Sequence, residues 1–176
     1  KDSRTVAGVI VDTSTYFVKE DENYQSIDWL VGELNINTQN TWRKFLNILE
    51  EKYPGYTLSI NATYRSYQRS IELEKQNPKN STPGYSPHNY AFAIDMNVTD
   101  PNGDEYSKEN RTSWVESGIP GVAKSLGMRW GGDFKNYVDC VHFDVTRVTD
   151  AAIINARKDN EGLPQSEWDT KNTNYV

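Results

Sequence analysis

Three short segments of this chain alternate apolar and polar residues, a spacing typical of β-strands that bury one face. The segments cover residues 57–63, 90–98 and 141–145. Apolar residues at helical spacing predict one helix before the first strand, over about 38–52, and another after it, over about 66–76. The sequence therefore predicts mixed α and β structure.

Two more helices are expected in the C-terminal half. Residues 113–126 have helical character that Gly118 and Pro120 interrupt. Residues 150–158 carry an apolar stripe behind an aspartate that can cap a helix. The polar residues 159–176 are expected to form an extended tail on the surface.

Size and composition indicate a single globular domain. The chain has 176 residues, of which 36% are hydrophobic and 25% are charged, and no repeat or linker divides it. We expect one domain over residues 1–176, with a motif-bearing core at about 38–158, an N-terminal extension at 1–37 and a C-terminal tail at 159–176. We also expect it to act as a monomer.

Charge and hydropathy argue against two classes of partner. A net charge of −6 and a pI near 5.0 leave no basic surface to neutralise nucleic-acid phosphates. Apolar stretches such as Val6–Val11 are far shorter than the roughly 20 residues that span a bilayer, so no membrane partner is expected. The start at Lys1 lacks the apolar region of a signal peptide, but a matured chain would lack it too, so the export route is not visible.

The chemistry concentrates around the two histidines, His88 and His142. Each lies in a segment that carries carboxylates, and two imidazoles with Asp95 make a common three-ligand set for catalytic zinc, which keeps a fourth position for water. His88 and Asp95 are seven residues apart, so an unbroken strand would separate them by about 23 Å. A turn at residues 89–91 must therefore bring His88, on a loop, back to the strand that carries Asp95.

Two further residues suit roles beside such a metal. Asp139 lies three residues before His142, which suits a general base that reaches the attacking water without ligating the metal. Arg65 is expected to end the first strand on its polar face. From there it could bind a substrate carboxylate or stabilise a developing oxyanion.

The neighbours of these residues are assigned structural roles. Trp130 and the glycines at 131–132 are expected to shape a tight turn beside the site. Asp133 and Asp144 are candidates to orient a ligand imidazole, as metal sites usually require. Cys140, the single cysteine, cannot form an internal disulfide and is expected to be a small packed thiol outside the metal site.

Four motifs in a fixed order resemble one family of zinc peptidases. They are Tyr64-Arg65-Ser66-Tyr67, Ser86-x-His88-x6-Asp95, Trp130-Gly131-Gly132-Asp133-Phe134 and Asp139-x-x-His142-Phe143. Over about residues 40–147 the chain looks like the D-alanyl-D-alanine carboxypeptidases and L-alanyl-D-glutamate endopeptidases of family M15. The Trp-Gly-Gly element and an aspartate at the base position resemble the endopeptidase branch, which includes many phage endolysins.

This resemblance implies a fold, a site and a function. The implied fold is the small α+β one shared with the hedgehog signalling domain, with a small antiparallel sheet and helices packed on one face. The implied zinc ligands are His88, Asp95 and His142. The implied catalytic residues are Asp139 and Arg65, and the implied substrate-binding residues are Arg65, Ser86 and Trp130. The substrate would be peptidoglycan stem peptides, cut at the bacterial cell wall by an L-alanyl-D-glutamate endopeptidase.

The sequence departs from the family at two positions. Ala91 stands where the family commonly has glycine, and since alanine disfavours positive φ, we expect a turn in which Ala91 avoids it. Asp144 follows His142-Phe143 where glutamate is frequent, which leaves the substrate preference open.

Two other functions stay open from the sequence. A D-alanyl-D-alanine carboxypeptidase would use the same site to release terminal D-alanine. A catalytically inactive zinc-containing binding module would keep the ligands, but the intact Asp139 and Arg65 argue against it.

Overall fold

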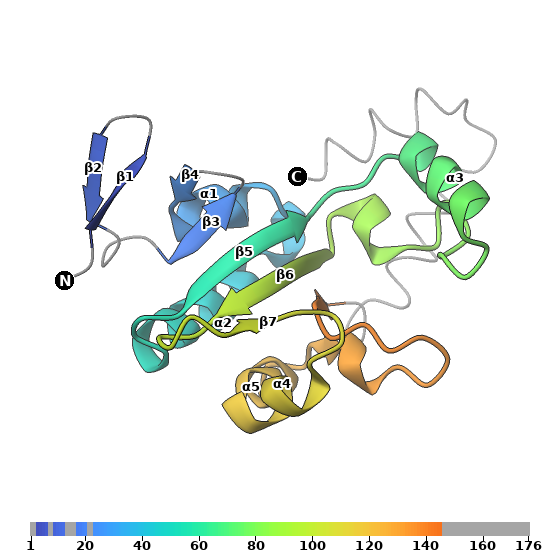
Figure 1. The fold of residues 1–176 in the computed structure, drawn as a ribbon. Helices are drawn as coiled ribbons and strands as arrows, with labels where there is room; N and C mark the ends of the chain where they lie inside the picture. Colours follow the sequence, from blue (N-terminus) through green and yellow to red (C-terminus); the bar gives the residue numbers. More distant parts are fainter. Residues whose placement is uncertain (1–2, 7–8, 13–16, 21–22, 146–176) are drawn as a thin grey trace.

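A computed structural model describes residues 3–6, 9–12, 17–20 and 23–145 (Figure 1). In these residues one sheet has the strand order β4-β3-β5-β6-β9-β8, with β7 also paired to β6, and β1 and β2 form a separate two-stranded sheet. The strands are β1 Ser3–Val6, β2 Val9–Asp12, β3 Val18–Glu20, β4 Asn23–Gln25, β5 Thr57–Ala62, β6 Ala93–Thr99, β7 Glu105–Tyr106, β8 Arg129–Trp130 and β9 His142–Asp144.

The three predicted strands are confirmed as β5, β6 and β9. They are neighbours in the sheet, and β6 runs antiparallel to both of the others. The expected α+β fold with a small antiparallel sheet is confirmed, with one difference: β3 runs parallel to β5. Since β3 lies within residues 1–37, the N-terminal extension supplies part of this sheet.

Helices fill the connections between the strands. The α-helices are α1 Ile27–Gly32, α2 Gln39–Lys52, α3 Tyr67–Gln76, α4 Arg111–Ser117 and α5 Ile119–Ser125. The 3-10 helices are η1 Ile36–Thr38, η2 Pro87–Tyr90 and η3 Gly131–Asp133. The predicted interruption is confirmed at Gly118, which adopts a φ of 80° between α4 and α5.

One face of the sheet carries the hydrophobic core. Phe45 of α2 and Trp114 of α4 each place a ring centroid 5.6 Å from that of Phe143 in β9. All three side chains have no exposed surface, and burying each one contributes roughly 2 to 3 kcal/mol of stability. Because side chains alternate along a strand, the neighbouring His142 projects from the opposite face of β9, away from α2 and α4.

Some predictions fall beyond the described residues. The helix expected at 150–158 and the tail expected at 159–176 lie outside them. Within the described ranges, no helix combines the length and the apolar character that crossing a bilayer requires.

Gly131 lets the end of β8 approach the loop that leads into β9. A Cβ at this position would lie 2.2 Å from the backbone oxygen of Asp139 and 2.9 Å from the Cβ of His142. We predict that Gly131→Ala lowers the free energy of unfolding by about 1 to 3 kcal/mol, because backbone must move to admit the methyl group. Chemical denaturation measures this change.

Gly121→Ala in α5 is the matched control. A Cβ at Gly121 meets nothing within 4 Å, so this substitution should be neutral or stabilise the helix by up to about 1 kcal/mol. Equal losses of stability in the two variants would contradict the packing argument.

Candidate metal centre

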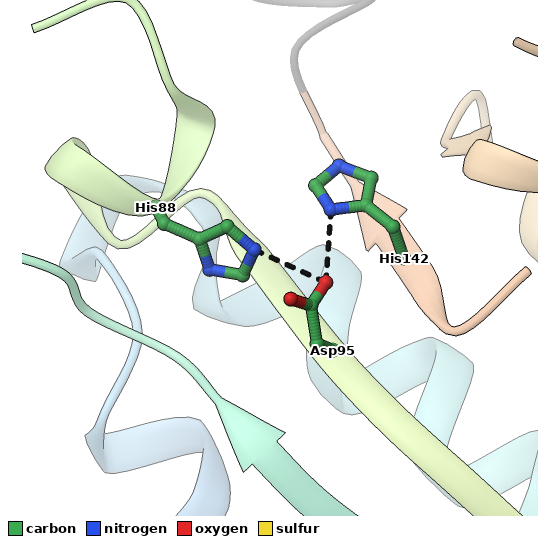
Figure 2. A group of neighbouring side chains, drawn as sticks. All are labelled: His88, Asp95 and His142. Atoms are coloured by element: carbon green, nitrogen blue, oxygen red, sulfur yellow. Dashed lines mark hydrogen bonds and ion pairs between the residues drawn. The ribbon is translucent and has the colours of Figure 1, made fainter. Parts of the chain in front are cut away.

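His88, Asp95 and His142 meet on the face of the sheet opposite α2 and α4 (Figure 2). Asp95 of β6 is paired across the sheet with His142 of β9, and His88 reaches in from η2. The Oδ1 atom of Asp95 lies 3.1 Å from Nε2 of His88 and 3.0 Å from Nδ1 of His142. One potential ligand atom from each residue lies within 4.8 Å of the other two. The structure thus brings together the three residues named from the sequence.

A left-handed turn returns the chain from His88 to β6. Ala91, at the end of η2, has φ 54° and ψ 37°, so the expectation that it avoids positive φ is wrong. This conformation costs an L-residue about 1 to 2 kcal/mol. It is held by an N–H bond from Ala91 to the carbonyl of His88 at 3.2 Å and by a bond from the Asn35 N–H to the carbonyl of Ala91 at 3.0 Å.

Each imidazole uses one nitrogen to bond protein and aims the other at Asp95. Nδ1 of His88 lies 2.7 Å from the backbone oxygen of Thr63, and because a carbonyl only accepts, Nδ1 must carry the hydrogen. Nε2 of His142 lies 2.6 Å from Oδ2 of Asp144. When Nε2 donates to Asp144, the neutral His142 ring presents a lone pair at Nδ1.

The donor set fits a metal ion. In neutral rings, Nε2 of His88 and Nδ1 of His142 are both acceptors, yet both face a carboxylate oxygen. The Nε2 atom of His88 is buried and makes no hydrogen bond within the described part of the chain. A cation between the three atoms would remove this repulsion between lone pairs. Tetrahedral zinc with bonds of about 2.0 to 2.2 Å holds its ligand atoms about 3.3 Å apart, close to the 3.1 and 3.0 Å found here.

The electrostatics of the site favour positive charge between these residues. Burial alone would raise the pKa of Asp95, but His88 and His142 lower it well below its usual range, so Asp95 is a carboxylate. Burial alone would lower the pKa of His142, but the bonds to Asp144 and Asp95 outweigh it and raise the pKa to about 9. The site therefore prefers to hold a proton or another cation beside Asp95.

Of the two aspartates considered as supports, only Asp144 contacts a candidate ligand ring. Asp144 has no exposed surface and accepts bonds of 2.9 Å from both Nε and Nη2 of Arg129. Asp133 instead pairs with Lys124 and Arg111. The bidentate bond from Arg129 fixes the carboxylate that in turn orients His142.

Asp139 and Arg65 both line the cavity, of about 460 Å³, into which the three candidate ligands open. Oδ1 of Asp139 is buried without a hydrogen-bond partner among the described residues. Burial and the nearby charge of Asp95 raise the pKa of Asp139, which suits a carboxylate that exchanges protons.

The placement of Arg65 on a strand was wrong. β5 ends at Ala62, and its pairing with β6 shifts register between Ile60 and Ala62, so alternation cannot be extended to residue 65. Arg65 lies in the connection to α3, where its N–H bonds the carbonyl of His88 at 2.9 Å. Its guanidinium makes no hydrogen bond or ion pair within the described residues. Burial lowers the pKa of Arg65, and the charge of Asp95 opposes this shift.

The two other candidate substrate-binding residues differ in access. Ser86 lines the cavity, but its hydroxyl accepts a bond from the N–H of His88 at 3.3 Å and caps η2. Trp130 is only 1% exposed, donates its Nε1–H to the carbonyl of Cys140 and does not line the cavity. Direct substrate contact by Trp130 is therefore not supported, whereas its expected structural role is.

Several residues that line the cavity were missed in the sequence. Lys108 precedes α4 and Tyr137 precedes Asp139, and both reach the cavity beside the predicted residues, as do Tyr85 and Arg129. Tyr137 could have been noticed, because it lies two residues before Asp139. Nothing in the sequence around Lys108 distinguishes it from other surface lysines.

The buried bond between Arg129 and Asp144 yields a prediction about stability and metal affinity. Arg129→Gln removes the arginine partner of the fully buried Asp144 carboxylate, so we expect a loss of about 3 kcal/mol in the free energy of unfolding. We also expect zinc affinity to fall about 10- to 100-fold, because His142 loses its fixed support. Denaturation and competition with a chelator measure the two effects.

Arg43→Gln is the control for this substitution. Arg43 pairs with Asp28 on the surface, where such bonds contribute about 0 to 1 kcal/mol, and it lies outside the cavity. If Arg129→Gln matches Arg43→Gln in unfolding free energy and in zinc affinity, the buried bond supports neither property.

Residues 79–145 match a family model described as D-alanyl-D-alanine carboxypeptidase. The matched segment contains both histidines of the site, Asp95 and Asp139. This part of the chain is therefore similar to the M15 peptidases that its motifs resemble.

The peptidoglycan L-alanyl-D-glutamate endopeptidase CwlK of Bacillus subtilis (strain 168) is 30% identical to this chain over 105 residues. The match covers 52% of this chain and 62% of that protein, so the chain spans less than two thirds of the length of this relative.

Two solved structures are also similar to parts of the chain. The L-Ala D-Glu endopeptidase ChiX of Serratia marcescens has a TM-score of 0.48 and 18% identity, and the match covers 66% of this chain and 84% of that one. The LD-carboxypeptidase LdcB has a TM-score of 0.42 and 17% identity, and the match covers 77% of this chain and 67% of that one.

Proposed function

We propose that this chain is a zinc-dependent peptidase that cuts peptidoglycan stem peptides as an L-alanyl-D-glutamate endopeptidase. The observation that carries the proposal is the convergence of His88, Asp95 and His142 within 4.8 Å, in one cavity with Asp139 and Arg65. The choice of bond is supported by the 30% identity to an L-alanyl-D-glutamate endopeptidase. We further propose that residues 1–176 form one domain that acts as a monomer at the bacterial cell wall.

The proposed reaction divides the chemistry between the metal and the chain. Zinc, when held by His88, Asp95 and His142, supplies a Lewis acid that polarises the scissile carbonyl and makes water acidic enough to be deprotonated near neutral pH. Asp139 takes the proton from the attacking water at a carboxylate oxygen and later gives it to the leaving amine. Arg65, which lines the same cavity, stabilises the developing oxyanion with its guanidinium charge.

Asp139 provides the sharpest test of this division. In Asp139→Asn the metal ligands remain, so we expect zinc to stay near one ion per chain while hydrolysis of peptidoglycan falls about 10²- to 10⁴-fold. Metal analysis and the release of new amino termini from purified cell walls measure the two properties.

Asp133→Asn is the matched control, since Asp133 lies outside the cavity and pairs with Lys124 and Arg111. This variant should keep both zinc and activity. Full activity of Asp139→Asn, or a wild-type chain that binds no zinc, would contradict the proposed role of the site.

Arg65 yields a separate prediction because its guanidinium has no hydrogen-bond or ion-pair partner among the described residues. We expect Arg65→Gln to lower kcat about 10²- to 10³-fold, as loss of an oxyanion donor does, with a change in unfolding free energy within about 0.5 kcal/mol. Steady-state kinetics and denaturation are the measurements. Arg69→Gln, which removes an exposed pair with Glu72 in α3, is the control and should leave kcat unchanged.

A D-alanyl-D-alanine carboxypeptidase is the second candidate, favoured by the description of the family model that residues 79–145 match. Mass analysis of digested muropeptides separates the two activities, because only the carboxypeptidase releases free D-alanine. A zinc-loaded chain that releases neither product from walls of several chemotypes would favour an inactive binding module.

A further inference from the structure

The site cavity is positively charged in an acidic protein. The chain has a net charge of −6, yet the cavity is lined by Arg65, Lys79, Lys108 and Arg129. The carboxylates that line it are Asp95 and Asp139, and Asp95 already faces two imidazoles. Basic side chains gathered in a cleft attract an anionic substrate.

Lys108 is held beside the proposed base. Its Nζ contacts the hydroxyl of Tyr137 and lies 4.2 Å from the centroid of the Tyr137 ring. Its backbone carbonyl accepts a bond from the N–H of Cys140, the residue after Asp139, at 3.4 Å. Partial burial would lower the pKa of Lys108, but the bond to Tyr137 and the charge of Asp139 raise it, so the ammonium group is kept charged.

Two of the other basic residues are engaged differently. Arg129 is committed to the buried Asp144. The N–H of Arg65 bonds the carbonyl of His88, so Arg65 is tied to a candidate metal ligand. The backbone of Lys108 instead bonds the N–H of Cys140, so Lys108 is tied to the segment that carries the proposed base.

The base must lie beside the scissile nitrogen, because it returns a proton to that atom. In a bond between L-alanine and D-glutamate, the carbon attached to this nitrogen also bears the α-carboxylate of the glutamate. A terminal D-alanine bears its carboxylate at the same place. A cation that lines the same cavity and is tied to the segment of Asp139 is thus suited to the negative charge that either substrate carries there.

We infer that Lys108, positioned by Tyr137, binds the carboxylate on the carbon that bears the scissile nitrogen. This inference rests on the proposed function and deepens it: the substrate class is a peptide with a free α-carboxylate on its leaving side. Arg65 then keeps its proposed role of stabilising the oxyanion. Lys108 is a substrate-binding residue, and Tyr137 acts through it.

Two synthetic stem peptides test the inference. They are identical except that the D-glutamate on the leaving side carries either an α-carboxylate or an α-carboxamide. In the zinc-loaded chain, Lys108→Gln should lower kcat/KM for the carboxylate peptide about 10- to 100-fold, mainly through KM, because a charge-assisted bond is lost. Its kcat/KM for the carboxamide peptide should be unchanged.

Two further variants separate binding from structure. Lys108→Arg should restore most of the preference for the carboxylate, and Tyr137→Phe should raise KM for the carboxylate peptide alone. Lys124→Gln is the control, since Lys124 lies outside the cavity and pairs with Asp133.

The outcomes distinguish this inference from the function on which it rests. If the wild-type chain cuts both peptides and Lys108→Gln leaves their ratio unchanged, or slows both equally, the role of Lys108 is wrong and the peptidase proposal stands. If the wild-type chain cuts neither these peptides nor those ending in D-alanyl-D-alanine, both are wrong.

Discussion

The candidate site depends on the pairing of β6 with β9, which sets Asp95 directly opposite His142. The same pairing sets Ile94 opposite Phe143 on the other face, where the helices bury both side chains completely. Because side chains alternate along strands, the core that fixes the register of these strands also fixes the position of the polar pair. A slip of one residue would turn Asp95 and His142 into the core.

The two histidines are held in place by different protein contacts. His88 is fixed by the carbonyl of Thr63, at the end of β5, and by the left-handed turn at Ala91. His142 is fixed by the buried carboxylate of Asp144, which Arg129 clamps with two bonds. The strain at Ala91 and the burial of Asp144 are local penalties that give the site its geometry.

Sequence reasoning succeeded where a pattern is local. The alternation of β5, β6 and β9 and the break at Gly118 follow from side-chain periodicity and backbone preference, and the structure confirms them. Predictions from the sequence were wrong where contacts between segments set the local conformation. The register shift in β5 removed the basis for placing Arg65, and the need to return His88 to β6 imposed positive φ on Ala91.

The sequence by itself determined the three candidate metal ligands, because the chain offers two histidines, each near carboxylates, and strand parity places His142 away from the core. Only the tertiary structure decided which nitrogen of each ring faces Asp95, since that choice depends on Thr63 and Asp144. It also decided that Lys108 and Tyr137 stand beside Asp139. The contacts of His88 with Thr63 and of Lys108 with Tyr137 join residues 25 and 29 positions apart, so no local spacing encodes them.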